Sequence, residues 1–185
     1  MITLLVNTPL GAINAELDEI AAPLTVANFL RYVAAGFFTG GQFWRTVRLD
    51  NQPDVAVKIE VVQADVNPAR KGELFAPIPL ERTRDTGLRH ADGALSMSRF
   101  APDSAMSSFF ICIGDQPALD FGGARNPDGQ GFAAFGRVRS GMDVVRAIQL
   151  SPCSLVGGSP DPAYAQMAYQ WLTPPIEIES ISARL

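Results

Sequence analysis

The chain has 185 residues, of which 47% are hydrophobic and 18% are charged, and its formal net charge is −4. This composition excludes a largely disordered protein, because disordered chains combine low hydrophobicity with high net charge. The negative charge also argues against general electrostatic binding to nucleic acid or to anionic membranes. We therefore expect one folded domain over residues 1–185 that binds neither.

The first residues, from Met1 to Asn7, carry neither a basic segment nor a long apolar segment of the kind that directs secretion. No apolar stretch approaches the ~18 residues of a membrane span. We therefore expect a cytoplasmic protein, with a periplasmic location as the alternative if a natural signal peptide has been removed. Cys112 lies in an apolar run and Cys153 in a loop-like segment, and we expect a buried structural thiol and an incidental one.

The chain is expected to open with a β-hairpin and a helix. Residues 2–6 are apolar and β-branched, residues 12–17 alternate, and the segment 8–11 between them has turn character. From Pro23 the period changes to the i, i+3, i+4, i+7 spacing of an amphipathic helix, which is carried by Val26, Phe29, Leu30 and Val33. Pro23 suits the first turn of this helix and Gly36 its end.

Short strands are predicted at residues 43–47, 55–64, 93–98, 108–113 and 131–138, and a final strand at residues 176–183. A second helix is predicted at residues 142–150, with Ser140 as N-cap and Asp143 favourably placed in the first turn. Many short strands with few helices favour an antiparallel barrel or sandwich over a parallel α/β sheet. Two long loops, residues 67–92 and 120–131, are either functional segments or plain surface insertions.

The common catalytic and cofactor-binding patterns are missing. His90 is the only histidine, so a catalytic triad or a multi-histidine metal site has no second imidazole. Its turn-like setting predicts a surface or structural role. Gly122-Gly123 lacks the Lys-Ser/Thr ending of a P-loop, and the dinucleotide fingerprint is absent. We predict no metal and no cofactor, and these patterns leave peptide binding, small-molecule binding and a structural role open.

Five segments, in family order, resemble the cyclophilin family of peptidyl-prolyl cis–trans isomerases. Residues 22–29 are similar to its first helix and residues 43–47 to its Phe-His-Arg strand. Residues 93–98 are similar to its Gly-x-Leu-Ser-Met-Ala strand, residues 107–112 to Ser-Gln-Phe-Phe-Ile, and residues 135–138 to Phe-Gly-x-Val. The resemblance implies a mainly β fold, an eight-stranded antiparallel closed barrel capped by two α-helices, with the peptide groove on its outer surface.

The resemblance also implies an activity: rotation about X–Pro bonds in proline-containing peptides and in unfolded or partly folded proteins, which assists folding. Arg45 stands at the catalytic arginine, and Gln63 at the glutamine that bonds the substrate backbone and helps hold that arginine. The other implied substrate-binding residues are Val61, Ser98, Arg99, Ser108, Phe110, Leu119 and Phe132. Two alternatives remain: a weakly catalytic, chaperone-like peptide-binding module of the same fold, and a small-ligand barrel. We expect a monomer.

Several positions depart from the family's pattern. Glu60-Val61 stand in place of Phe-Met. Either Glu60 pairs with Arg45 and withholds it from substrate, or a one-residue slip places Ile59 in the pocket. Ala64-Asp65 stand in place of Gly-Gly.

On the other walls of the implied pocket, Ser98 and Arg99 replace Ala-Asn. Ser108 stands where a second glutamine is common, and Phe132 where histidine is common. Ala118 replaces a tryptophan, and we therefore expect weak binding of cyclosporin-type inhibitors.

Overall fold

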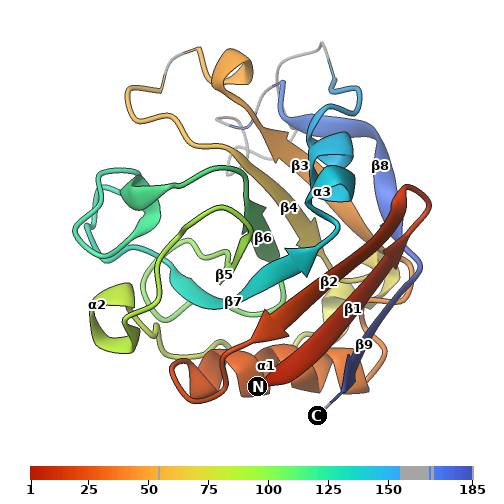
Figure 1. Cartoon of the computed structure of the whole chain (residues 1–185), viewed down its shortest axis with the longest axis horizontal. Helices are drawn as coiled ribbons and strands as arrows, with labels where there is room; N and C mark the ends of the chain where they lie inside the picture. Colours follow the sequence, from red (N-terminus) through yellow and green to blue (C-terminus); the bar gives the residue numbers. More distant parts are fainter. Residues whose placement is uncertain (54, 155–166, 168, 185) are drawn as a thin grey trace.

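The computed structural model describes residues 1–53, 55–154, 167 and 169–184. Figure 1 shows its arrangement, a twisted sheet rolled around a core with helices at its ends. The strands are β1 (Ile2–Thr8), β2 (Gly11–Leu17), β3 (Gly41–Val47), β4 (Val61–Asp65), β5 (Ala94–Met97), β6 (Phe109–Cys112), β7 (Ala133–Ser140), β8 (Trp171–Ile178) and β9 (Ser180–Arg184). The helices are α1 (Pro23–Ala34), α2 (Thr83–Thr86) and α3 (Met142–Gln149), with short 3-10 helices η1 (Leu49–Asn51), η2 (Pro68–Glu73) and η3 (Pro117–Leu119).

The last two strands close the barrel. The strand order is β8-β3-β4-β6-β5-β7-β2-β1-β9, and every pairing is antiparallel. Only Glu179 separates β8 from β9, and its backbone N–H donates to Asn7 O at 2.9 Å. The C-terminal segment thus runs from the β3 edge to the β1 edge (Figure 1). This confirms the predicted antiparallel closed barrel; nine strands are numbered because the last one divides at Glu179.

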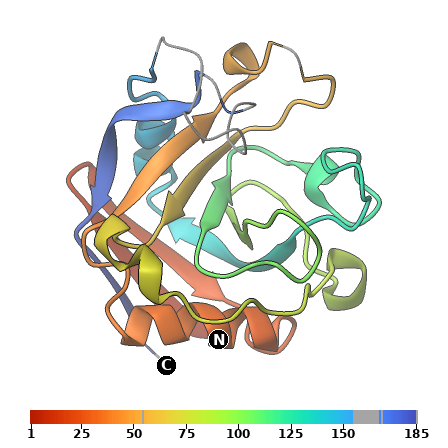
Figure 2. The same ribbon diagram turned by 180° about the vertical axis from the view of Figure 1, so that it is seen from behind.

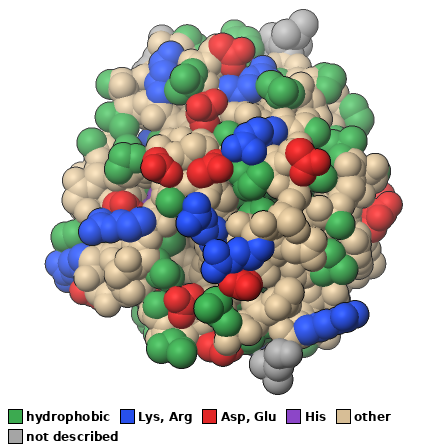
Figure 3. Space-filling view, viewed as in Figure 1, with side chains coloured by type: hydrophobic (Ala, Val, Ile, Leu, Met, Phe, Trp, Pro, Cys, Tyr) green, Lys and Arg blue, Asp and Glu red, His purple; other side chains and the backbone are tan. Residues whose placement is uncertain are grey.

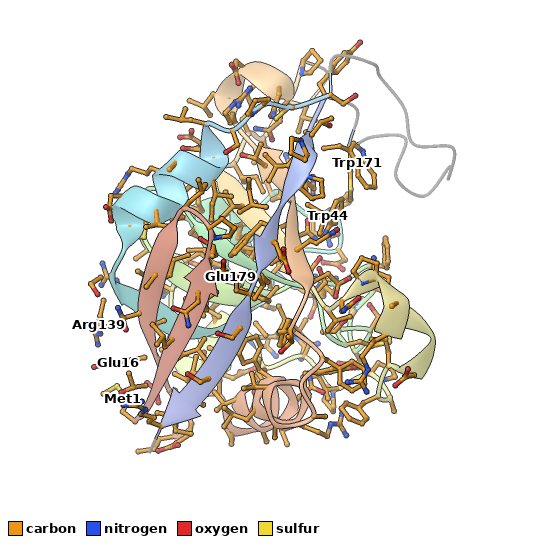
Figure 4. The ribbon with its side chains drawn as sticks, turned by 90° about the vertical axis from the view of Figure 1, so that its right-hand side faces the viewer. Met1, Glu16, Trp44, Arg139, Trp171 and Glu179 are labelled. Carbon is orange, nitrogen blue, oxygen red and sulfur yellow. The ribbon has the colours of Figure 1, made fainter. Side chains whose placement is uncertain are left out.

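The barrel interior is filled with aliphatic and aromatic side chains. Phe29 of α1 lies at its centre, with ring centroids 5.1 Å from Phe38 and 5.2 Å from both Phe109 and Phe135. Burying each such ring contributes about 1.5–3 kcal/mol. Helix α3 adds its own apolar face, and the two helices lie at different ends of the barrel (Figures 1 and 4).

The predicted starts of β4 and β8 and the predicted N-cap of α3 are wrong, and the other predicted ends are within two residues of the observed ones. Strand β4 begins at Val61 rather than at residue 55, because the Gln52 side chain bonds both the N–H and the carbonyl of Ile59 and holds this segment as a loop. Helix α3 is preceded by Gly141 rather than capped by Ser140. Gly141 has a φ of +92°, and a Cβ there would lie 2.4 Å from Ala12 O, so glycine is required.

Strand β8 begins at Trp171, five positions earlier than predicted, and includes Pro174 and Pro175. Proline cannot donate to a β-ladder and is tolerated at bulges. The register explains its presence: Ile176 pairs with Phe43 and Trp171 with Arg45, so the prolines fall within the irregular stretch between these two pairs.

Three further features are the position of the termini, the distribution of surface charge and the length of the helices. Both termini lie at the α1 end of the barrel (Figures 1 and 2). Acidic and basic side chains are interspersed on the face in Figure 3, and neither sign gathers there. Among the described residues, the helices are too short or too polar to span a bilayer.

Candidate active site

A groove of about 830 Å³ lies on the outer face of the barrel, along β3, β4 and β6. Every site residue implied by the sequence lines it. They are Arg45, Val61, Gln63, Ser98, Arg99, Ser108, Phe110, Leu119 and Phe132. Residues from β3, β4, β6, η3 and the loops therefore converge on one hollow, as the resemblance implied.

A β-bulge in β3 turns Arg45 toward this groove. In a regular strand, successive side chains point to opposite faces, so Phe43 and Arg45 would both point inward. The register shifts between these two residues against both β4 and β8. Phe43 is fully buried in the core, whereas Trp44 and Arg45 both line the groove. The extra residue of the bulge thus redirects a charged side chain out of the barrel.

Arg45 is held by two neutral amide side chains. Its Nη1 donates to Gln63 Oε1 at 2.8 Å, and its Nε and Nη2 donate to Gln170 Oε1 at 2.9 and 2.7 Å. Burial, with a smaller contribution from the nearby Arg125 guanidinium, lowers the pKa of Arg45 to about 9, so the side chain keeps its proton at neutral pH. No ion pair joins Arg45 to a carboxylate in the described part of the chain, and its charge is not neutralised there.

Gln63 is fixed in turn by two serines. Its Nε2 donates to Ser98 Oγ and to Ser108 Oγ, both at 3.0 Å, and Ser108 Oγ donates to Ala64 O at 3.1 Å. Both amide hydrogens of Gln63 are therefore used, and the Oε1 that remains faces Arg45. The two serines orient the glutamine, which orients the arginine.

A second hydrophobic cluster, separate from the barrel core, underlies the groove. It comprises Val47, Ile59, Val61, Ala94, Phe110, Cys112 and Leu119, with Ala118 and Phe132 packed against it. Five of these residues line the groove: Ile59, Val61, Phe110, Leu119 and Phe132. Phe110 meets Phe132 edge to face at a centroid distance of 5.6 Å. This apolar surface beside a guanidinium matches a small, partly apolar ring such as that of proline.

His90 lies behind Phe110, with the two rings nearly parallel at 6.0 Å. It is buried, and its structural role follows from its contacts: Nδ1 lies 2.8 Å from Asp120 Oδ1, and Nε2 lies 2.9 Å from Ser96 Oγ. Burial alone would raise the pKa of Asp120, but the hydrogen bonds from His90 outweigh it and lower that pKa. This network fixes the back of the hydrophobic hollow.

Arg99 lines the groove, but its guanidinium points under the loop of residues 120–131. Nη1 and Nη2 donate to Asp128 at 2.7 and 2.9 Å, and Nε donates to Gly131 O at 2.8 Å. The Arg99 side chain is 1% exposed. Its charged group is therefore engaged in holding the loop, which in turn carries Phe132 at its end.

The proposed Glu60–Arg45 pair is absent. Glu60 instead accepts a hydrogen bond from Gln149 of α3 at 3.0 Å. The register slip is absent too, because Val61 and Gln63 both face the groove while Val62 lies in the barrel core. Ile59, two residues before Val61, shares that outward face and lines the groove as well.

Several lining or supporting residues escaped the sequence analysis, among them Gln170, Trp171 and Arg125. Trp171 begins β8, whose start was predicted too late, and Gln170 directly precedes it. Arg125 lies in the predicted 120–131 loop, where no periodicity indicates the direction of a side chain. The available signal for Arg125 was its position: it is a basic residue in a Gly-rich loop that directly follows Leu119, an implied pocket residue.

The cysteines carry no chemistry at this site. Cys112 is buried and Cys153 half-buried, both as free thiols, as predicted; burial raises the pKa of each. Within the described residues, His, Cys, Asp and Glu side chains form no cluster suited to a metal ion. What the groove offers is a fixed cationic hydrogen-bond donor beside an apolar hollow.

Comparison with known proteins agrees with this geometry. The family model for cyclophilin type peptidyl-prolyl cis-trans isomerases matches residues 1–181. The peptidyl-prolyl cis-trans isomerase cyp18 of Streptomyces antibioticus is 36% identical over 150 residues, or 80% of this chain and 84% of the relative. Peptidyl-prolyl cis-trans isomerase A of Dickeya dadantii is 34% identical over 154 residues, or 83% of this chain and 74% of the relative.

A solved structure shares the fold. The crystal structure of a cyclophilin type isomerase of Cryptosporidium parvum, in the presence of the dipeptide Ala-Pro, has a TM-score of 0.72 and 18% sequence identity, covering 99% of each chain. The sequence matches, the barrel topology and the groove lead to one conclusion: the chain belongs to the cyclophilin-type peptidyl-prolyl cis-trans isomerase family.

Proposed function

We propose that the protein catalyses cis–trans rotation about X–Pro bonds in peptides and in unfolded or partly folded proteins, with Arg45 as its catalytic residue. One observation carries this proposal: a guanidinium held by neutral oxygens faces the same groove as the hollow around Phe110. The groove thus combines a binding surface for a proline ring with a donor for its nitrogen.

The reaction makes and breaks no covalent bond. Its barrier of about 18–20 kcal/mol comes from amide resonance, which is lost when the bond twists. The prolyl nitrogen then gains lone-pair character and accepts a hydrogen bond that it cannot accept in either planar form. A donor placed at that nitrogen therefore stabilises the transition state more than the ground state.

Arg45 has donors available for this step. A guanidinium has five N–H bonds, and three are used by Gln63 and Gln170. One N–H on Nη1 and one on Nη2 remain for substrate. Because the acceptors that hold it are uncharged, the full positive charge is available to the twisted amide.

The neighbouring residues have distinct parts in the proposal. Gln63, with both amide hydrogens engaged, acts mainly as a positioning residue, and only its Oε1 can contact the peptide backbone. Ser98 accepts from Gln63 through its oxygen and can donate its own hydroxyl proton to a peptide carbonyl. Val61, Phe110, Leu119 and Phe132 enclose the proline ring, whose burial contributes on the order of 1–2 kcal/mol. Monomeric state, weak cyclosporin binding and cytoplasmic location remain predictions.

The test compares the wild type with Arg45→Ala in an NMR exchange assay on a proline peptide. Loss of one preorganised donor typically costs about 10²–10³ in rate, so we expect kcat/KM to fall at least about 100-fold. Arg139→Ala is the matched control, because Arg139 pairs with Glu16 on the β2–β7 side, away from Trp44 and the groove (Figure 4). Equal rates for wild type and Arg45→Ala would refute the role of Arg45. Peptide-induced shifts near Phe110 without catalysis would favour the binding module.

A further inference from the structure

A second arginine, Arg125, faces the same groove as Arg45 and comes from the loop of residues 120–131. Its backbone N–H donates to Ala118 O at 3.1 Å. The loop returns this closely because Gly123 has no side chain; a Cβ there would lie 2.3 Å from that same oxygen. Arg125 is therefore fixed beside η3 by the fold of the loop.

The Arg125 guanidinium is anchored at one corner only. Nη1 donates to Gln52 Oε1 at 2.9 Å and to Val57 O at 2.6 Å, which uses both of its hydrogens. The Nε and Nη2 hydrogens have no partner in the described part of the chain. These two nitrogens form the side-on fork that binds a carboxylate through two parallel hydrogen bonds.

The charge of Arg125 is not neutralised by the described residues. The nearby loop carboxylates are engaged elsewhere: Asp128 with Arg99, and Asp120 with His90 and Arg89. Among the described residues that line the groove, Asp65 is the acidic one. Its carboxylate accepts a hydrogen bond from Ser107 at 2.7 Å and pairs with Lys71 at 3.6 Å. Two guanidinium groups thus share one groove.

Electrostatics favours an anion between them. Burial lowers the pKa of Arg125, and its repulsion contributes to the lowered pKa of Arg45. Both arginines line the groove, and their burial leaves the two positive charges less screened by solvent. A carboxylate entering the groove would relieve this repulsion and meet the open fork of Arg125.

We propose that Arg125 is a specificity-determining residue that binds a side-chain carboxylate of the substrate, so that the protein prefers proline sites with Asp or Glu within two residues of the proline. This inference rests on the proposed isomerase function. The ligand is part of the same peptide, because Arg125 lines the groove in which the proline would lie.

The experiment uses proline peptides that are acetylated and amidated, so that no terminal carboxylate competes. Glu is compared with its neutral isostere Gln at each position from two before to two after the proline. NMR exchange measures kcat/KM, since a coupling protease would add a sequence preference of its own. In the wild type we expect Glu to exceed Gln by about five- to tenfold at one position, as for a partly desolvated ion pair. We expect 1 M salt to reduce this ratio.

The variants separate recognition from loop structure. Arg125→Gln should bring the Glu/Gln ratio to about one, because the rate on Glu peptides falls more than the rate on Gln peptides. Arg125→Lys should restore part of the ratio, because it keeps the charge but not the fork. Arg139→Gln, which removes a positive charge outside the groove, should keep the full wild-type ratio.

Three results would overturn the inference while leaving the proposed function intact. They are a wild-type ratio of one at every position, a ratio in Arg125→Gln that stays at the wild-type value because both peptides lose equally, which would make Arg125 a loop-supporting residue, and a ratio that falls as much in Arg139→Gln as in Arg125→Gln. Wild-type inactivity on all peptides would instead refute the proposed function, and the inference with it.

Discussion

Gln170 Oε1 accepts two hydrogen bonds from Arg45, at 2.9 Å from Nε and 2.7 Å from Nη2, across 125 positions of sequence. Gln170 is itself buried, and its Nε2 donates to Asn51 O at 3.1 Å. The orientation of the proposed catalytic donor is therefore set together by Asn51, in the first turn after β3, and by Gln170, directly before β8.

Replacing Gln170 by Leu should impair catalysis without impairing binding. Arg45 would lose two of its three hydrogen bonds and sample other rotamers, so we expect kcat to fall about tenfold with KM little changed. Leaving the guanidinium without these acceptors should also cost about 1–3 kcal/mol in unfolding free energy. Steady-state kinetics and urea unfolding measure the two effects. A rise in KM alone would contradict a positioning role.

The His90–Asp120 pair should make stability depend on pH at the acid end. A carboxylate only accepts, so Nδ1 is assigned the proton, and Nε2 accepts from the Ser96 hydroxyl. The pKa of Asp120 lies below its ordinary value of 3.8 in the folded state. Folding thus favours the ionised form, and the stabilisation is complete above about pH 5 and is lost as the pH falls through the folded-state pKa.

Asp120→Asn should accordingly lower the unfolding free energy at pH 7 and flatten its decline between about pH 5 and pH 3. Urea unfolding at a series of pH values measures this. Asp143→Asn, on the exposed face of α3, is the control and should leave the slope of the wild type unchanged. If Asp120→Asn were to keep that slope as well, the pair would not be the source of the acid sensitivity.

Breaking the Arg99–Asp128 pair should loosen the loop that carries Arg125 and Phe132. Asp128→Ala leaves a guanidinium that is 1% exposed with only carbonyl acceptors. We expect a loss of about 1–3 kcal/mol in stability and faster amide hydrogen exchange in residues 121–131. Exchange in β1 and β2, on the far side of the barrel, serves as the internal control. Uniform acceleration across the chain would indicate global destabilisation instead.

Ala118 should limit the binding of cyclosporin-type inhibitors. It packs, half-buried, against the apolar cluster of the groove, where the family commonly has tryptophan. An indole there offers a large apolar surface and an N–H donor, and burying part of it is worth about 1.5–3 kcal/mol. Ala118→Trp should therefore tighten cyclosporin binding at least about tenfold in calorimetry. An Ala35→Trp variant, at an exposed site after α1, should not.

Local sequence patterns predicted many of the helices and strands correctly. The period of α1 and the alternation of β2 predicted these elements, because periodicity and turn chemistry act over a few residues. The resemblance of five segments to the cyclophilin family then implied the closed barrel. The resemblance also implied that Arg45, Gln63 and Phe110 share one groove, and all three line it. Boundaries were missed where a distant group intervened, as Gln52 does at Ile59, or where a bulge tolerates prolines, as in β8.

From the sequence alone, residue type and spacing along single elements indicated the class of fold, and the resemblance to the cyclophilin family implied nine of the residues that line the groove. Only the tertiary structure decided what those residues face. The bulge at Trp44 turns Arg45 outward. Glu60 bonds Gln149 instead of Arg45. Gln170 bonds Arg45, and Arg125 lines the groove, although both lie far from Arg45 along the chain. The physical reason is that a side-chain hydrogen bond needs two groups within about 3 Å, and such proximity is set by strand register and loop closure, which no local pattern encodes.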